Sequence, residues 1–154
     1  MEMTSYLTYN EILSIYQKMI DKSGGGFAGV LDDGAIQSIL EFVQNDDYYN
    51  SFVDKLTFLV FRFCRGHYFN DGNKRIALTI GTAFLLHNGY FWAARNFMAQ
   101  LEAIVYHIAA SNIDEDLLHR IIHCIVNEQD YDEKLKIDIA NAISNNSLEQ
   151  KLSD

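Results

Sequence analysis

The chain is organised around the nine residues His67-Tyr68-Phe69-Asn70-Asp71-Gly72-Asn73-Lys74-Arg75, which directly precede a long apolar run. Asp71-Gly72 is a turn signal and Asn73 belongs to a helix-capping residue type, so we expect a helix to begin near Lys74. The first-turn N–H groups of such a helix have no intrahelical partner and carry partial positive charge. Lys74 and Arg75 add full positive charges there. The turn is therefore predicted to bind an anion, and phosphate is the usual one.

Two further side chains in this stretch fit a group-transfer reaction. His67 can act as a general base near neutral pH, and Asp71 offers hard oxygen ligands to a metal that also binds phosphates. A base, a metal ligand and a phosphate site together indicate transfer of a phosphorus-containing group to a hydroxyl. The alternative is a basic helix start with a chance histidine, since short motifs also occur without function.

Before this stretch, the apolar residues recur at helical spacing behind recognisable caps. The capping box Thr8-Tyr9-Asn10-Glu11 predicts a helix over residues 9–22. Asp32-Asp33 caps a second helix that runs to about Val43, and a third begins near Ser51 and ends before Gly66. The fourth, over residues 73–87, is apolar on nearly every face, so we expect it to be the buried centre of a helical bundle.

The rest of the chain predicts three more helices after a short extended segment at Tyr90-Phe91-Trp92. Asn96 is expected to cap helix five, whose buried stripe comprises Met98, Leu101, Val105 and Ile108. A sixth helix follows Asn112 and runs to about residue 127. A weaker last helix covers about residues 132–143, with a frayed tail after it. We interpret residues 1–154 as a single all-α domain, with its core at about 8–127 and a C-terminal helix and tail at 128–154.

Composition and charge narrow the possible partners. The chain has 154 residues, 49% hydrophobic residues and a formal net charge of -9, which suits one domain with a core. An acidic chain is a poor ligand for nucleic acid or an anionic membrane, so we expect neither as a partner. The absence of an apolar span and of a basic-then-apolar leader predicts a cytoplasmic protein. Cys64 and Cys124 are interpreted as reduced core thiols.

A zinc site is a competing interpretation of the sixth helix. His119 and His123 are four residues apart and Cys124 is adjacent. Neither a metalloprotease-type Glu nor a fourth ligand is evident, so a partly exposed histidine pair is favoured.

The motif His67-x-Phe69-x-Asp71-Gly72-Asn73-Lys74-Arg75 resembles the signature of the Fic/Doc family, because seven of its nine positions match. The flanking Arg65-Gly66 and Ile76-Ala77-Leu78 are also similar to the Doc (death-on-curing) branch. Fic adenylyltransferases carry Gly where this chain has Lys74, and a second Arg where it has Leu78. Gly72, where Doc has Ala, points the other way. The resemblance extends from about Thr8 to Val126.

The resemblance implies an all-α bundle of six to seven helices with a central buried helix and a short flap or hairpin. The flap corresponds to residues 24–31, and its residues Gly24, Gly25, Gly26 and Phe27 are expected to position the target by backbone pairing. A plain flexible linker is the alternative, since glycine-rich loops are common. Phe69 is expected to anchor the motif in the core.

The resemblance also implies roles for the motif residues in a reaction that uses ATP or a related nucleotide and Mg²⁺. His67 takes the proton of a protein hydroxyl, Asp71 holds Mg²⁺, and Lys74 and Arg75 with the backbone after Gly72 stabilise the transferring phosphate. Asn73 fixes the loop and donates to a phosphate oxygen.

The Doc-like interpretation is a protein kinase toxin that is controlled by a separate antitoxin protein and acts on a protein such as a translation factor. Two alternatives remain open: a Fic-type adenylyltransferase (AMPylation) and a catalytically silent module that binds a nucleotide or partner. Some Fic proteins carry an inhibitory helix, and Ser111 to Glu115 has its spacing. Asp116 follows in place of Gly or Asn, and Leu78 replaces the Arg partner, so built-in inhibition is not expected.

Overall fold

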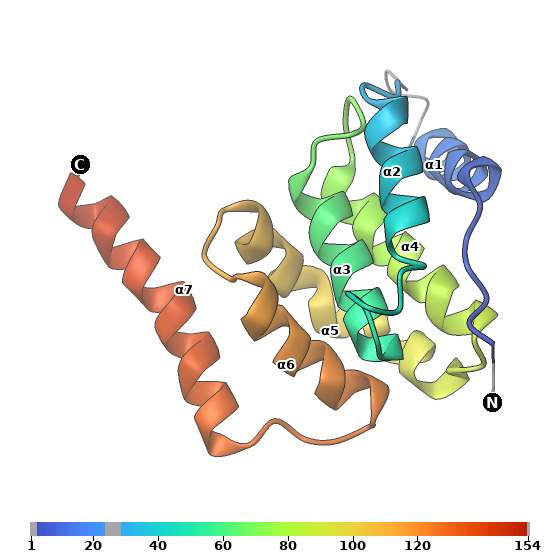
Figure 1. The fold of residues 1–154 in the computed structure, drawn as a ribbon. Coiled ribbons are helices and arrows are strands. Elements are labelled where there is room, and N and C mark those ends of the chain that lie inside the picture. Colours follow the sequence, from blue (N-terminus) through green and yellow to red (C-terminus); the bar gives the residue numbers. More distant parts are fainter. Residues whose placement is uncertain (1–2, 24–28, 154) are drawn as a thin grey trace.

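The structure is a computed structural model that describes residues 3–23 and 29–153, with side chains up to residue 144. Its described residues form helices and no strands, which confirms the predicted all-α fold (Figure 1). The helices are α1 (Tyr9–Lys22), α2 (Asp33–Phe42), α3 (Phe52–Arg65), α4 (Asn73–His87), α5 (Phe91–Ala109), α6 (Glu115–Val126) and α7 (Glu133–Ser153).

Local capping sets where several helices begin. Thr8 and Glu11 form a reciprocal capping box at α1, and Ser51 and Asp54 form a second one at α3. Each box satisfies N–H groups that the first turn of a helix leaves without an intrahelical partner. The predicted starts of α1 and α3 are therefore correct to within a residue.

Helix α4 lies at the centre of the bundle, as predicted. It packs against α1, α3 and α5, and the side chains of Ile76, Ile80 and Phe84 are 0% exposed. Gly81 allows α5 to approach closely, because a Cβ atom at this position would lie 2.5 Å from Cε1 of Phe97. The body of α4 is thus packed on several sides, which holds the N-terminus of the helix in place, and the motif lies there.

The start of α5 differs from the prediction. Residues 90–92 are not extended: α5 begins at Phe91 with Tyr90 as its N-cap, and Asn96 lies inside the helix. The Tyr90 ring stacks on Phe52 at 4.3 Å and its N–H donates to the Leu85 carbonyl at 2.9 Å, so tertiary packing overrides the β-like aromatic run. Met98, predicted to be buried, is 41% exposed.

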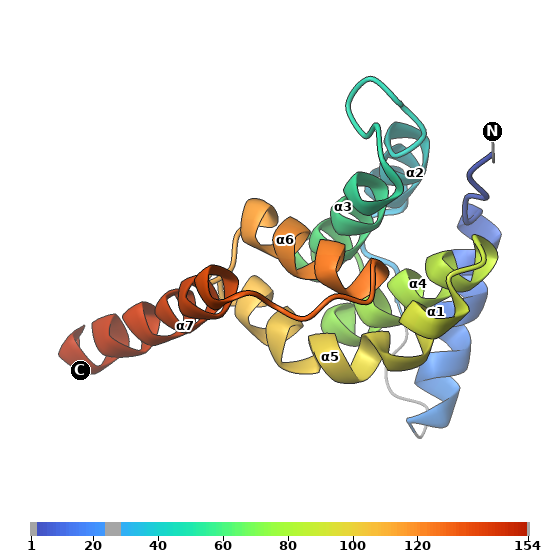
Figure 2. The same cartoon turned by 90° about the horizontal axis from the view of Figure 1, so that it is seen from below.

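Helix α7 continues to Ser153, beyond the predicted end near residue 143. It packs on α6 through the buried Leu135 and an ion pair between Arg120 and Asp138, whose Nη1 and Oδ2 atoms are 2.6 Å apart. From there it extends away from the other helices, as both orientations show (Figures 1 and 2).

None of the helices in the described ranges combines the length and the apolar character needed to cross a membrane.

Candidate active site

The motif loop, residues 66–72, connects the end of α3 to the start of α4. Gly66 is the C-cap of α3, and Gly72 adopts a left-handed conformation with φ +77° as the N-cap of α4. His67 is also left-handed, with φ +50°. Side chains other than glycine pay about 1–2 kcal/mol for this conformation. The imidazole is therefore presented by a strained backbone, a feature that concentrates at functional sites.

Asn73 holds the motif loop closed. Its Oδ1 accepts from the Phe69 N–H at 3.1 Å, and its Nδ2 donates to the Phe69 carbonyl at 3.0 Å. The prediction that Asn73 caps the helix was wrong, because Gly72 is the N-cap and no side chain caps α4. The asparagine binds the loop backbone instead, so the N–H groups of the first turn stay without a side-chain acceptor.

Helix α1 packs against the motif loop. Phe69 is 1% exposed and its ring centroid lies 4.2 Å from that of Tyr16. The Tyr16 hydroxyl donates to the Asp71 carbonyl oxygen at 3.2 Å. A Cβ atom at Gly72 would lie 2.8 Å from Cε of Met19. These contacts fix the loop against α1.

A cleft of about 340 Å³ opens at the N-terminus of α4. Five residues of the motif line this cleft, namely Asp71, Gly72, Asn73, Lys74 and Arg75. Both cations and the Asp71 carboxylate are exposed, and Oδ1 of Asp71 accepts from the Gly72 N–H at 2.8 Å. The five consecutive predicted residues therefore share one cleft, where two cations and free N–H groups can attract an anion.

Helix α5 supplies the opposite wall of this cleft through Glu102, Val105 and Tyr106, which sequence reasoning missed. Leu78 on α4 completes the lining. Glu102 and Tyr106 are exposed and four residues apart, beside the buried stripe of α5. That spacing is visible in the sequence, but no local pattern predicts that the side of α5 with Glu102 and Tyr106 faces Lys74.

His67 does not line the cleft. Its side chain is exposed, and among the described residues the imidazole has no hydrogen-bond partner. The structure thus brings Asp71 to Arg75 together in the cleft and holds His67 at the opposite end of the same loop.

The predicted flap is described only at its C-terminal end. Gly24, Gly25, Gly26 and Phe27 lie outside the described residues. Beyond them, Val30 and Phe69 form an antiparallel bridge. Asn70 donates its N–H to the Gly29 carbonyl at 2.8 Å, and Leu31 donates to the Tyr68 carbonyl at 2.8 Å. Residues 29–31 therefore lie beside the motif loop.

His119 is engaged away from the motif, by α3. Its Nε2 lies 2.7 Å from Oδ1 of Asp54, and His123 is exposed. Burial raises the pKa of Asp54, but hydrogen bonds from the Ser51 N–H and from His119 outweigh burial and lower it. In the part of the chain that the structure describes, no three His, Cys, Asp or Glu side chains gather as a metal site.

Comparison with known proteins identifies the family of this chain. The sequence profile of the "Fic/DOC family" matches residues 6–85, which include α1 to α3 and most of α4. This chain belongs to the Fic/DOC family. It is also similar to "Protein kinase doc" of Escherichia phage P1, with 34% identity over 88 residues that cover 54% of this chain and 68% of that protein. No solved structure gave a significant match. Transferases are typical of the Fic/DOC family, and its members use nucleotides.

Proposed function

We propose that this Fic/DOC protein transfers the γ-phosphate of ATP to a Ser, Thr or Tyr hydroxyl of another protein. One observation carries the proposal. An exposed imidazole, held on a left-handed backbone, shares a single short loop with an uncapped helix N-terminus that bears two cations. The similarity to a protein named as a kinase supports the same choice.

In this reaction His67 is the general base. Its imidazole is accessible to an incoming hydroxyl, and no carboxylate or carbonyl of the described residues occupies it. Such a base accepts the hydroxyl proton as the new O–P bond forms. The bond between the γ-phosphorus and the β–γ bridging oxygen breaks, and ADP leaves with the bonding electrons. Loss of the base should lower the rate about 10²- to 10⁴-fold.

The phosphates of ATP are proposed to bind at the start of α4. Lys74 and Arg75 supply full charges, and the first-turn N–H groups supply aligned donors. Asn73 closes the loop so that these donors keep their positions. Phosphoryl transfer depends mainly on positioning and electrostatics, so a rigid cradle supplies much of what the reaction needs.

The Asp71 carboxylate fits a magnesium ion. Its Oδ1 accepts a hydrogen bond from the Gly72 N–H, and its Oδ2 has no hydrogen-bond partner among the described residues. Mg²⁺ is usually bound by one or two carboxylates together with substrate phosphates, and it neutralises charge on the transferring group. Asp71 is thus the residue that would hold it.

The choice of phosphate rests on two lining residues. Lys74 and Leu78 stand in the cleft where Fic adenylyltransferases carry Gly and a second Arg. We therefore infer transfer of the γ-phosphate and release of ADP, rather than adenylyl transfer and release of pyrophosphate.

The test is an incubation of the purified protein with a cell extract and ATP labelled at either the α- or the γ-phosphate. We expect γ-label on an extract protein, and α-label there would overturn the kinase assignment. His67→Ala should lower the rate of labelling about 10²- to 10⁴-fold. His123→Ala, which removes another exposed histidine, should leave labelling unchanged. If His67→Ala kept full labelling, the motif would have no base.

The biological setting follows from the same proposal. We propose a cytoplasmic toxin that modifies a protein such as a translation factor and is held in check by a separate antitoxin chain. Expression of the wild-type protein should arrest growth, and His67→Ala should not. Arrest by both proteins would favour a catalytically silent binding module.

A further inference from the structure

An aromatic groove of about 320 Å³ lies between α2 and α3 and reaches the motif loop at Tyr68. Phe42 lines it from α2, and Phe58 and Arg62 line it from α3. Tyr49 closes it from the α2–α3 connection, and Tyr68 closes it from the motif loop. The groove shares no lining residue with the cleft at the start of α4.

Three rings of this groove, those of Phe42, Tyr49 and Phe58, form one cluster that is partly open to solvent. The Tyr49 and Phe58 centroids are 4.3 Å apart, and the Phe42 and Tyr49 centroids are 5.9 Å apart. Phe42 also stacks on Tyr48, and these two side chains are 48% and 69% exposed. Large rings held in contact at a surface are typical of the centres of protein-binding sites.

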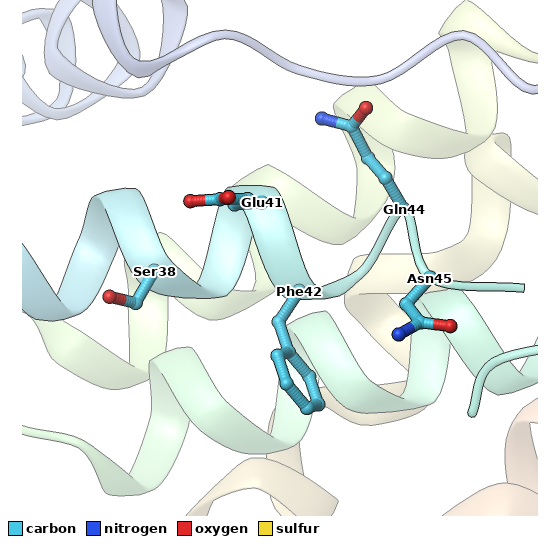
Figure 3. A pocket seen from close by; sticks show the side chains of 5 residues that line it. All are labelled: Ser38, Glu41, Phe42, Gln44 and Asn45. Carbon is cyan, nitrogen blue, oxygen red and sulfur yellow. The ribbon is translucent and has the colours of Figure 1, made fainter. Parts of the chain in front are cut away.

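Phe42 joins the groove to a second hollow at the end of α2. Figure 3 shows Phe42 and Asn45 projecting on one side of the chain there, with Gln44 projecting on the other. Ser38 and Phe42 line both hollows, which together accommodate more than a single side chain.

Arg62 gives the groove a charge preference. Its guanidinium carbon lies 5.6 Å from the centroid of the Phe58 ring, and the side chain is exposed. Burial raises the pKa of Glu115 and the positive charge of Arg62 opposes that rise, yet among the described residues no carboxylate oxygen lies within 4.0 Å of the Arg62 guanidinium. In a chain of net charge -9, this cation beside an apolar surface is complementary to a carboxylate.

The groove ends beside the proposed base. Tyr68 lines it, and His67 is the preceding residue, so the two Cα atoms are about 3.8 Å apart. An extended segment advances about 3.3 Å per residue. A peptide seated on Phe42 and Arg62 therefore needs only a few more residues to bring a hydroxyl to His67.

We propose that the aromatic groove docks an extended segment of the acceptor protein, with an apolar or aromatic side chain next to an Asp or Glu. The apolar side chain packs on Phe42 and Tyr49, and the carboxylate pairs with Arg62. Identifying this partner as the acceptor rests on the proposed kinase function. The prediction that the groove binds an apolar side chain next to an acidic one does not depend on the kinase function.

The test uses a display library of short random peptides, selected on the full-length protein. Enriched peptides should combine an apolar residue with a nearby acidic one. Their affinities are then measured by fluorescence anisotropy. Arg62→Glu should weaken binding about 10-fold or more, as expected for the loss of a charge-assisted contact, and Phe42→Ser should weaken it similarly. Arg95→Glu is the matched control, because Arg95 stacks on Trp92 in the same manner on α5.

The proposal is overturned if no peptide is enriched, if the enriched peptides are basic or lack an acidic residue, or if both groove variants bind them like wild type. Failure of the kinase proposal looks different. Peptides would still bind through Arg62, but one extended by a Thr would take no label from γ-labelled ATP. If the kinase proposal holds, Arg62→Glu should lower kcat/KM for the Thr peptide about 10-fold through KM, with kcat unchanged.

Discussion

Replacing Asn73 by Ala tests whether a single side chain holds the motif loop. The variant loses two hydrogen bonds to the Phe69 backbone, each worth about 1 kcal/mol, and leaves that half-buried N–H and C=O unsatisfied. The better helix propensity of Ala returns about 0.5 kcal/mol. We therefore expect the free energy of unfolding to fall by about 2 kcal/mol, measured by urea denaturation with an unchanged slope.

The control for this experiment is Asn96→Ala. Asn96 is exposed inside α5, and its replacement should change the free energy of unfolding by less than about 0.5 kcal/mol. Asn73→Asp separates the two bonds, because it keeps an acceptor for the Phe69 N–H but turns a second oxygen towards the Phe69 carbonyl. It should destabilise the protein even though an acidic residue is favourable at a helix N-terminus. If Asn73→Ala and Asn96→Ala proved equally stable, the loop would have to be held by Phe69 and Tyr16 alone.

Three further predictions concern the body of the protein. Gly81→Ala should destabilise by about 1–3 kcal/mol in thermal or urea unfolding, because its Cβ would press on Phe97, whereas Gly34→Ala should not. The lowered pKa of Asp54 contributes stability that is fully present above its ordinary pKa of about 3.9 and is lost as the pH falls through the folded-state value. The difference in unfolding free energy between wild type and Asp54→Asn should therefore shrink below about pH 4; a constant difference would contradict this. Burial raises the pKa of Cys64 to about 11, so iodoacetamide at neutral pH should label it only in urea, as mass spectrometry would show.

Most of the fold follows from local signals in the sequence. The capping box at Thr8 indicated the start of α1, the periodic apolar residues placed the start of α3 near Ser51, and the all-round apolar pattern identified α4 as the central helix. These signals work because capping and burial act within one element. Tyr90 was misinterpreted for the opposite reason: its ring packs on Phe52, some forty residues earlier, and this contact sets the start of α5.

In the candidate site, too, the features set by neighbouring residues were predicted and those set by long-range packing were not. The five consecutive residues from Asp71 to Arg75 had to share a neighbourhood, and they do share a cleft. The role of Asn73 was only partly predicted, because its capping propensity is real but its side chain reaches backwards to Phe69. Glu102 and Tyr106 could not be found, since their place in the cleft depends on how α5 is rotated against α4.

The left-handed backbone at His67 carries an evolutionary consequence. Glycine would relieve left-handed strain of about 1–2 kcal/mol at a smaller entropic cost of about 0.5–1 kcal/mol, so a mutant library screened only for heat resistance should accumulate glycine there. Under the proposed toxin function, a library screened for toxicity in living cells should keep histidine. The two screens would then select different residues at position 67, so stability and activity would be in conflict at this single position.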